Sequence, residues 1–521
     1  MTAKPLPLLI AALLLNSMPS EAKEENTVAD ANGCKFITPT GSPPSAKLTW
    51  DGACVEGYLN GQGTATLDGW VVYQGEFKRG QLEQGEVRFG SNGFYKGELK
   101  NNEPSGPGVL RLEDGRTVSG VFAKGQPTGV VDITWPNGVQ YHGEVARGPV
   151  SHGKGKMTYA DGSTHEGEFN QGVAHGQGTL IYADGGAYTG GFAFGRYQGH
   201  GVEKSAAGTI YDGEFQNDYR HGKGKMTYAN GSAYEGEFSQ GKLHGQGALT
   251  YSEGGSYVGG FAFDQFHGRG AYKGADGSTY DGEYVNGHRQ GKGTMRNADG
   301  SGCVGEFVAD QLQGKARCDY PDGSSYEGEW KANKLSGECK IVYATTATYS
   351  GQCVNGSAGG TGHYEGPDGA VYDGGMMAGI YHGRGRLKRT DTGYVFEGDF
   401  IAGVASGRGK EVTPGGEQYE GQFARNLREG QGVLRATGPD GTEFVYDGAF
   451  KNGVMHGTGK LTVGDMKFDG EFKLGKFVRG KVHSGDDRTI EADLEAQTFF
   501  ELKADGTKVP LDELPPPEPR A

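Results

Sequence analysis

Aromatic and glycine positions alternate with charged or polar positions in short runs that recur every 23 residues. Four consecutive examples are YDGEF, YEGEF, YVGGF and YDGEY, which begin at Tyr211, Tyr234, Tyr257 and Tyr280. A period of two is typical of a β-strand with one covered face. A second alternating run follows each first one, as in GKGTM from Gly291, and an Asp-Gly turn signal ends the unit. The pattern therefore predicts one β-hairpin in every unit of 23 residues.

The aromatic run occurs eighteen times between Tyr73 and Phe468, and a weaker copy, VEGYL, precedes them at Val55. Most steps are 23 residues, a few are 22 or 24, and one step of 27 leads to Tyr446. Asp-Gly turns join each hairpin to the next. We therefore expect an all-β fold, an elongated, twisted, single antiparallel meander of about eighteen tandem hairpin repeats.

Tyrosine, glycine and phenylalanine share one face of the predicted strands. An aromatic ring can lie over a glycine of the neighbouring strand because glycine has no Cβ. A single hairpin cannot bury such a face alone, so stability has to come from stacked neighbours. The opposite face is charged, and we expect Glu283 to lie across the hairpin from Lys292, and Glu214 from Lys223.

Composition supports an ordered repeat protein. Glycine accounts for 98 of 521 residues, well above the usual ~7%. There is no glycine at every third position, which excludes collagen. The 27 tyrosines and 24 phenylalanines argue against a disordered chain. The net charge of −14 disfavours nucleic acids and anionic membrane surfaces as partners, because both are polyanions.

The first 22 residues have the features of a secretory signal peptide. Lys4 supplies a positive charge, Leu6–Leu15 is apolar apart from Pro7, and Ser20 and Ala22 are small residues at a cleavage site. An apolar run of about ten residues is too short to cross ~30 Å of hydrocarbon as a helix. We therefore expect cleavage after Ala22 and an exported protein, periplasmic or secreted.

The repeat resembles the MORN (membrane occupation and recognition nexus) repeat. Good copies are YEGEFSQGKLHGQG from Tyr234 and YDGGMMAGIYHGRG from Tyr372, and the resemblance covers about residues 50–480. It implies scaffolding, protein–protein contact and, in some members, association with membranes. The stretch from Gly33 to Gly61 is similar to the lead-in of exported bacterial MORN proteins.

These features divide the chain into five parts. The last one, which ends in PPPEPRA, is expected to be disordered, and the part before it, with the stretch TIEADLEAQTFFELKADG, is expected to form a short helix or a terminal hairpin that caps the open sheet edge. The parts are a signal peptide (1–22), a disulfide-bearing N-terminal lead-in (23–54), the repeat array (55–480), a C-terminal cap (481–509) and a disordered tail (510–521).

Six cysteines are present, and the repeat register suggests how they pair. We number the positions of a repeat from its first aromatic, which is position 0. Two positions within a hairpin face each other when their numbers sum to 15, so Cys303 at position 0 should be bridged to Cys318 at position 15. Across the Asp-Gly turn we expect the numbers of facing positions to sum to 40. Cys339 and Cys353 satisfy this sum, because they stand at positions 13 and 27 counted from Tyr326. The gaps of 15, 21 and 14 residues do not match the paired ligands of structural zinc. The predicted disulfides are Cys303–Cys318, Cys339–Cys353 and, by exclusion, Cys34–Cys54.

No pattern in the chain predicts catalysis, a cofactor or a metal. Several histidines form a row because they occupy the same turn position in successive copies of the repeat. Neighbouring histidines in this row are ~10 Å apart, whereas a catalytic zinc needs three ligands that converge on one point. Acidic pairs such as Asp212 and Glu214 lie on the solvated face and not in a cleft. No glycine-rich segment links a strand to a helix as a phosphate loop does. The row is His175, His221, His244, His267, His382 and His456.

Four turn aromatics are candidate partner contacts. Phe194 and Tyr197 lie in one turn, and Phe263 and Phe266 lie in the corresponding turn 69 residues later. Aromatic side chains are enriched at interface hot spots; the alternative is local packing across each turn. We expect a non-enzymatic scaffold of the cell envelope that binds an unidentified protein or a second copy of itself. The alternative is a module that binds a lipid surface or an envelope polymer, with lipid disfavoured by the charge.

Overall fold

The computed structural model describes residues 26–39, 45–485 and 487–513, and all regular elements in these ranges are β-strands. The predicted signal peptide therefore lies outside the described residues. The chain forms two compact units, Met1–Gln265 and Phe266–Ala521, and each is described by itself. The boundary between them falls at the start of β23.

The first unit contains the strands β1 to β22. Their bounds are β1 (Thr27–Ala29), β2 (Lys35–Ile37), β3 (Leu48–Trp50), β4 (Ala53–Val55), β5 (Tyr58–Leu67), β6 (Val71–Lys78), β7 (Gln81–Phe89), β8 (Gly93–Lys100), β9 (Glu103–Arg111), β10 (Thr117–Ala123), β11 (Gln126–Thr134), β12 (Gln140–Val145), β13 (Ser151–Thr158), β14 (Thr164–Asn170), β15 (Val173–Ile181), β16 (Ala187–Ala193), β17 (Arg196–Lys204), β18 (Ile210–Gln216), β19 (Tyr219–Thr227), β20 (Ala233–Ser239), β21 (Lys242–Thr250) and β22 (Ser256–Ala262).

The second unit contains the strands from β23 onward. Their bounds are β23 (Gln265–Lys273), β24 (Thr279–Val285), β25 (His288–Arg296), β26 (Gly302–Val308), β27 (Gln311–Asp319), β28 (Ser325–Lys331), β29 (Lys334–Val342), β30 (Thr348–Val354), β31 (Ser357–Glu365), β32 (Ala370–Met377), β33 (Ile380–Arg389), β34 (Val395–Ile401), β35 (Val404–Val412), β36 (Gln418–Ala424), β37 (Leu427–Thr437), β38 (Glu443–Lys451), β39 (Val454–Val463), β40 (Met466–Lys473), β41 (Lys476–His483), β42 (Thr489–Asp493), β43 (Thr498–Leu502) and β44 (Lys508–Leu511).

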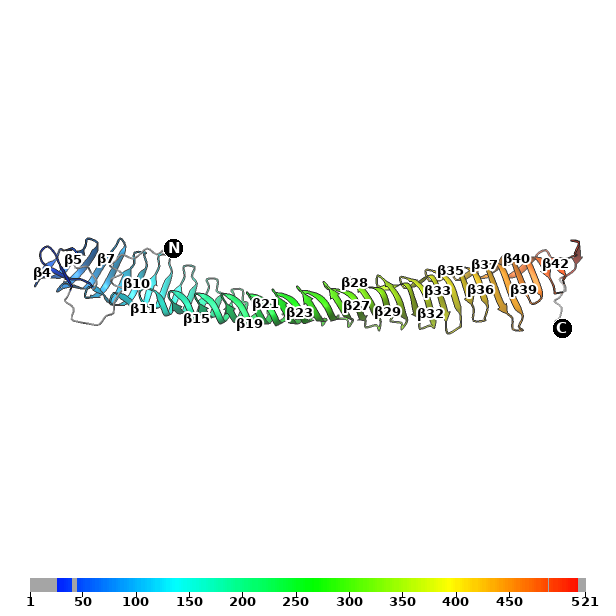
Figure 1. Ribbon diagram of the computed structural model, residues 1–521, viewed down its shortest axis with the longest axis horizontal. Coiled ribbons are helices and arrows are strands. Elements are labelled where there is room, and N and C mark those ends of the chain that lie inside the picture. Colours follow the sequence, from blue (N-terminus) through cyan, green and yellow to red (C-terminus); the bar gives the residue numbers. More distant parts are fainter. Residues whose placement is uncertain (1–25, 40–44, 486, 514–521) are drawn as a thin grey trace. The chain divides into compact units, whose positions relative to one another are not determined.

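From β5 onward, consecutive strands within each unit are hydrogen-bonded neighbours, whereas β2, β3 and β4 each pair with β5. In the first unit, each strand from β5 to β22 pairs with the next one in antiparallel orientation, and in the second unit the same holds from β23 to β44. Figure 1 shows the strands of each unit following one another in chain order. The fold is therefore all-β, an open antiparallel meander of tandem hairpins in each unit, as the period of 23 predicts.

The register inside each hairpin differs from the prediction beyond the first glycine. In β24 and β25, Gly282 lies opposite Gly293 as expected, but the register then shifts and Glu283 lies opposite Gln290. Lys292 lies opposite Glu306 on the following strand β26. The predicted pairing of Glu283 with Lys292 is therefore wrong, because a β-bulge inserts two residues into the second strand.

The same correction applies to Glu214, which lies opposite His221, while Lys223 lies opposite Glu237. The bulge turns at Gly222, whose φ of +60° favours glycine. In equivalent repeats the acidic side chain contacts the backbone beyond the bulge, since Glu237 accepts a hydrogen bond from the N–H of Gln246 at 3.3 Å. The recurrent glutamate therefore stabilises the bulge and does not form the predicted ion pair.

Tyrosine rings cover glycines on the buried face, as predicted. Tyr211 is fully buried, and a Cβ added to Gly224 on the adjacent strand would lie 2.5 Å from the Tyr211 ring. The Tyr211 hydroxyl donates a hydrogen bond to the carbonyl of Glu214 at 2.9 Å. Its ring packs edge-on against Phe215 of its own repeat (5.1 Å) and Phe238 of the next (4.9 Å). This ladder of alternating rings is the core of the repeat array.

The N-terminal lead-in covers the first repeats. Phe36 is fully buried and lies 4.9 Å from the ring of Tyr73. The buried side chain of Asn102 donates hydrogen bonds to the carbonyls of Ile37 and Gly80, and so joins the lead-in to the sheet. The lead-in thus contributes rings and hydrogen bonds to the end of the ladder.

The C-terminal segment extends the sheet with strands. β42, β43 and β44 add one after another to β41, so the hairpin alternative holds and the helix alternative is wrong. Pro510 and Leu511 end β44, which moves the start of the expected disordered tail beyond Leu511. Residues 514–521 lie outside the described part of the chain.

His165 replaces the usual tyrosine and is buried without full hydrogen bonding. Its side chain is 1% exposed, packs against Phe169 and Phe192, and has an Nε2 atom with no hydrogen-bond partner within the described part of the chain. Burial lowers the pKa of His165 from its ordinary value, because the charged form is disfavoured away from water. The folded state therefore keeps this histidine neutral where the unfolded chain takes up a proton.

We expect His165→Tyr to stabilise the protein by about 1–2 kcal/mol and to reduce its acid sensitivity. As the pH falls below ~6.5, only the unfolded wild-type chain gains this proton, so stability present at neutral pH is lost. Tyrosine at this position can donate to the Glu168 carbonyl as Tyr211 does to Glu214. Urea unfolding at pH 7.5 and 5.0 measures both effects, with exposed His142→Gln as the control. An unchanged pH slope in His165→Tyr would contradict this account.

Candidate functional site

The structure contains three disulfides, in the pairs expected from the sequence: Cys34–Cys54, Cys303–Cys318 and Cys339–Cys353. Cys303 lies directly opposite Cys318 on β26 and β27, with a Cα–Cα distance of 4.1 Å. Facing positions therefore sum to 15, as predicted, in the part of the hairpin between the bulge and the open end of the hairpin.

The register behind the third disulfide differs from the prediction. Cys339 lies opposite Gly351, and Cys353 lies opposite Gly337, so the two cysteines are diagonal neighbours with Cα atoms 5.9 Å apart. The predicted sum of 40 across the turn is two residues too large. The cause is the loop at residues 343–347, which makes Val342 the partner of Thr348.

Two of the cysteines occupy ring positions of the core. Cys303 replaces the first aromatic of its repeat, and Cys353 replaces the second. In a regular repeat the first tyrosine packs against the second aromatic of the next repeat, as Tyr419 does with Phe450 at 4.8 Å. The corresponding partner of Tyr326 is Cys353, and Tyr326 is half-buried where Tyr419 is fully buried. The second ring is also missing in the next repeat, where Met376 takes its place.

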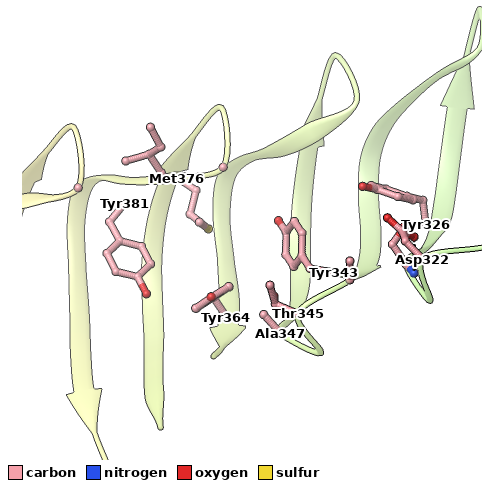
Figure 2. Close-up of a pocket in the computed structure, with 13 residues that line it drawn as sticks. Asp322, Tyr326, Tyr343, Thr345, Ala347, Tyr364, Met376 and Tyr381 are labelled. Carbon is pink, nitrogen blue, oxygen red and sulfur yellow. Dashed lines mark hydrogen bonds between the residues drawn. The ribbon is translucent and has the colours of Figure 1, made fainter. Parts of the chain in front are cut away.

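An open groove of about 620 Å³ lies at this place, wholly within the second unit. Three half-buried tyrosines line it in a row, and Figure 2 shows them projecting from neighbouring parts of the sheet. The ring centroids of Tyr343 and Tyr364 are 6.4 Å apart, and those of Tyr364 and Tyr381 are 5.9 Å apart. We call this feature the tyrosine groove: Tyr326, Tyr343, Tyr364, Met376, Ile380 and Tyr381, with Asp322 at the Tyr326 end.

Burial raises the pKa of the groove hydroxyls. It raises the pKa of Tyr343 and of Tyr381 to about 12, and it raises the pKa of Tyr364 in the same direction. At neutral pH each hydroxyl is therefore a hydrogen-bond donor as well as an acceptor. The groove combines apolar ring faces with these few donors.

The four turn aromatics fall into two kinds. Phe194 and Phe263 project into solvent, with 84% and 67% of their surface exposed. Tyr197 is buried and stacks on Tyr188 at 3.6 Å, and Phe266 is half-buried against Tyr284 at 5.5 Å. Local packing therefore accounts for Tyr197 and Phe266, while Phe194 and Phe263 remain available for a partner.

The backbone at both exposed phenylalanines has the conformation that recurs in the turns of this array. Phe194 and Phe263 have φ angles of +53° and +51°, a region that favours glycine or asparagine in two-residue hairpin turns. Each ring has an edge-to-face contact with a histidine of the preceding repeat, His175 at 6.2 Å and His244 at 5.9 Å. Other repeats carry residues such as Gln171, Ala309 or Asn355 at this position with φ near +50°, so the exposed rings and not the backbone distinguish these two turns.

The histidine row does not converge on a metal. Within the described ranges there is no group of three or more histidine, cysteine, aspartate or glutamate side chains that could hold an ion. The same ranges contain no helix with the length and hydrophobicity needed to cross a membrane. The chemistry visible on this surface is recognition by rings, hydroxyls and charged pairs.

Comparison with family models shows that fifteen segments of the chain match the MORN repeat, and together they cover more than half of it. The matched residues are 73–83, 95–115, 150–164, 165–187, 188–210, 211–233, 234–256, 257–279, 280–302, 303–325, 326–347, 372–394, 396–418, 419–441 and 446–465. The unmatched stretch 348–371 is the repeat that carries Cys353 and Tyr364. No curated protein matches the chain.

Several solved structures show a weak likeness. The TCP10 domain of Danio rerio CPAP in complex with a STIL peptide is 13% identical, with a TM-score of 0.22, over 47% of this chain and 96% of that one. The SAS-4 TCP domain of Drosophila melanogaster with a proline-rich motif of Ana2 is 14% identical, with a TM-score of 0.16, over 37% and 83%. Virginiamycin B lyase from Staphylococcus aureus is 10% identical, with a TM-score of 0.10, over 50% and 92%. These TM-scores are too low to support an argument.

Proposed function

The chain belongs to the MORN repeat family, and from this premise we propose that it is a non-enzymatic scaffold of the cell envelope that binds a protein partner through Phe194 and Phe263. The repeats indicate a repeat-based binding or scaffold protein. The observation that carries the finer proposal is the exposure of these two phenylalanines in equivalent turns of repeats 69 residues apart. The three disulfides fit an oxidising, exported compartment.

The energetics of the two turns favour recognition over stability. An exposed ring leaves apolar surface in water. Buried at an interface, a central aromatic side chain typically contributes 2 kcal/mol or more. The two rings repeat on one hairpin edge with the same local geometry, which fits a partner that contacts both turns.

We expect Phe194→Ser with Phe263→Ser to reduce partner capture at least tenfold without loss of stability. Capture is measured by crosslinking the mature chain, from Lys23, in the envelope fraction of its source cells, followed by mass spectrometry. The matched control is Gln171→Ser with Gln240→Ser, since these exposed residues occupy the same turn position with φ near +50°. Equal capture by both double variants would reject the two phenylalanines as the contact site.

Flotation with liposomes tests the alternative function of lipid binding. The charge of −14 argues against it, and the mature chain is expected to stay at the bottom with zwitterionic and anionic vesicles at low and physiological salt. Flotation with anionic vesicles at low salt only would show a basic patch and make lipid the ligand.

A further inference from the structure

We propose that the tyrosine groove is a binding site for a proline-rich segment, and that its occupant is the C-terminal Leu514–Arg520 of a second copy of this chain. The groove lies where Met376 replaces the second aromatic of its repeat, next to the stretch 348–371 that the family model does not match. The inference goes beyond the proposed function, because it concerns another surface and does not involve Phe194 or Phe263.

The lining of the groove suits a polyproline helix. Such a helix is recognised on rows of aromatic rings, because proline rings pack on their faces and the exposed carbonyls accept hydrogen bonds from ring hydroxyls. The rings of Tyr343, Tyr364 and Tyr381 follow one another at 6.4 and 5.9 Å. A row of this length, about 12 Å, corresponds to about four residues of polyproline helix at ~3.1 Å each.

An oligosaccharide fits the lining less well. Sugar rings offer many hydroxyl groups that need several directed polar partners. Among the groove residues, Asp322 is the only charged side chain, and it already accepts hydrogen bonds from the backbone and hydroxyl of Ser324. The remaining surface consists of tyrosine rings, Met376, Ile380 and small residues. This composition favours an apolar peptide with few donors, which proline provides because it has no N–H.

The sequence contains such a segment at its end. LPPPEPR runs from Leu514 to Arg520 and follows β44, the last described strand. Its charged residues are Glu518 and Arg520, and Asp322 lies at the Tyr326 end of the groove. A pair between Arg520 and Asp322 would direct the C-terminal end of the bound segment towards Asp322 and would leave Glu518 two residues away from it.

The distance along the sheet requires the segment to come from a second copy. Eleven strand-to-strand steps separate β33, which carries Tyr381, from β44, or ~50 Å at ~4.8 Å per step. The ten residues after Leu511 extend at most ~36 Å. Two molecules that exchange tails form a closed dimer, whereas one-way binding of each tail to the next molecule forms a ring or an open, head-to-tail assembly.

Sedimentation velocity of the full mature chain, over a range of concentrations, tests the proposal. We expect the association of the wild-type chain to rise with concentration. Replacement of Pro515, Pro516 and Pro517 by alanine should weaken this association at least tenfold. These prolines lie after the last strand, so the readout does not depend on folding. A synthetic peptide of residues 511–521 is expected to dissociate the assembly, and the same peptide with alanine for proline is not.

A matched pair of groove variants locates the site. Tyr364→Ala is expected to weaken association at least tenfold, whereas Tyr272→Ala, the same repeat position four repeats earlier, leaves it unchanged. Both tyrosines are half-buried, so their effects on stability should match. The proposal is overturned by a monomer at every concentration, by equal effects of the two variants, or by chitotetraose occupying the groove while the peptide does not. Phe194→Ser with Phe263→Ser should leave association intact, which separates this test from that of the proposed function.

Discussion

Arg428→Ala is expected to destabilise the second unit by about 3–4 kcal/mol. Arg428 and Glu411 form an ion pair at 2.8 Å on the aromatic face, with side chains that are only 13% and 12% exposed. The guanidinium also lies 5.2 Å from the centre of the Tyr419 ring, and Tyr394 donates a hydrogen bond to the other oxygen of Glu411 at 3.1 Å. Removal of the arginine leaves a buried carboxylate without its countercharge, which is the costly way to break such a pair.

Urea unfolding of the mature chain measures this loss, and hydrogen exchange assigns it to β35–β37. The control is Arg220→Ala, since Arg220 forms the equivalent pair with Glu203 at 2.8 Å but both side chains are more than a quarter exposed. We expect a loss of about 1 kcal/mol there, because solvent screens the unpaired charge.

A double replacement at the buried pair distinguishes charge burial from lost packing. Glu411→Met with Arg428→Leu reproduces the pair Met226 and Leu243, which occupies the same two repeat positions elsewhere. We expect its stability to return to within about 1 kcal/mol of wild type, because an apolar pair of similar volume has no desolvation cost. If the double variant is as unstable as Arg428→Ala, the unpaired charge is not the cause of the loss.

Gly224→Val is expected to cost at least about 3 kcal/mol, although valine usually favours strands. A Cβ at Gly224 would lie 2.5 Å from atoms of the buried Tyr211 ring, closer than any relaxed contact allows. The ring cannot move aside easily, because its hydroxyl is hydrogen-bonded to Glu214 and its edges contact Phe215 and Phe238. Thermal or urea unfolding measures the loss.

Lys225→Val is the matched control, because Lys225 is the next residue and lies exposed on the opposite face. We expect a change within about 0.5 kcal/mol. Tyr211→Ala alone should cost about 3–5 kcal/mol, but in combination with Gly224→Val the total should be clearly less than the sum, because removal of the ring also removes the clash. Strict additivity of the two changes would contradict the packing of this ring over this glycine.

The sequence alone determined the repeating unit and its core. Alternation over five residues places Tyr211, Gly213 and Phe215 on one face, and a step of 23 residues brings each hairpin against the next. These are local features, so a pattern of residue types is enough to predict strands, turns and the ring-over-glycine contact. The disulfide Cys303–Cys318 follows for the same reason, since both residues lie between the bulge and the open end of the hairpin, where the register is regular.

Only the tertiary structure decided the register beyond the bulge and the surfaces available for binding. The pairing of Glu283 depends on a glycine in a left-handed conformation, which the alternation of residue types does not encode. Phe194 is exposed and Tyr197 buried in one turn because a neighbouring ring, Tyr188, takes up the second side chain but not the first. The tyrosine groove lies where Met376 takes the place that a phenylalanine usually occupies in a repeat. Such outcomes depend on side-chain volumes in neighbouring hairpins, and those volumes act only once the strands are packed together.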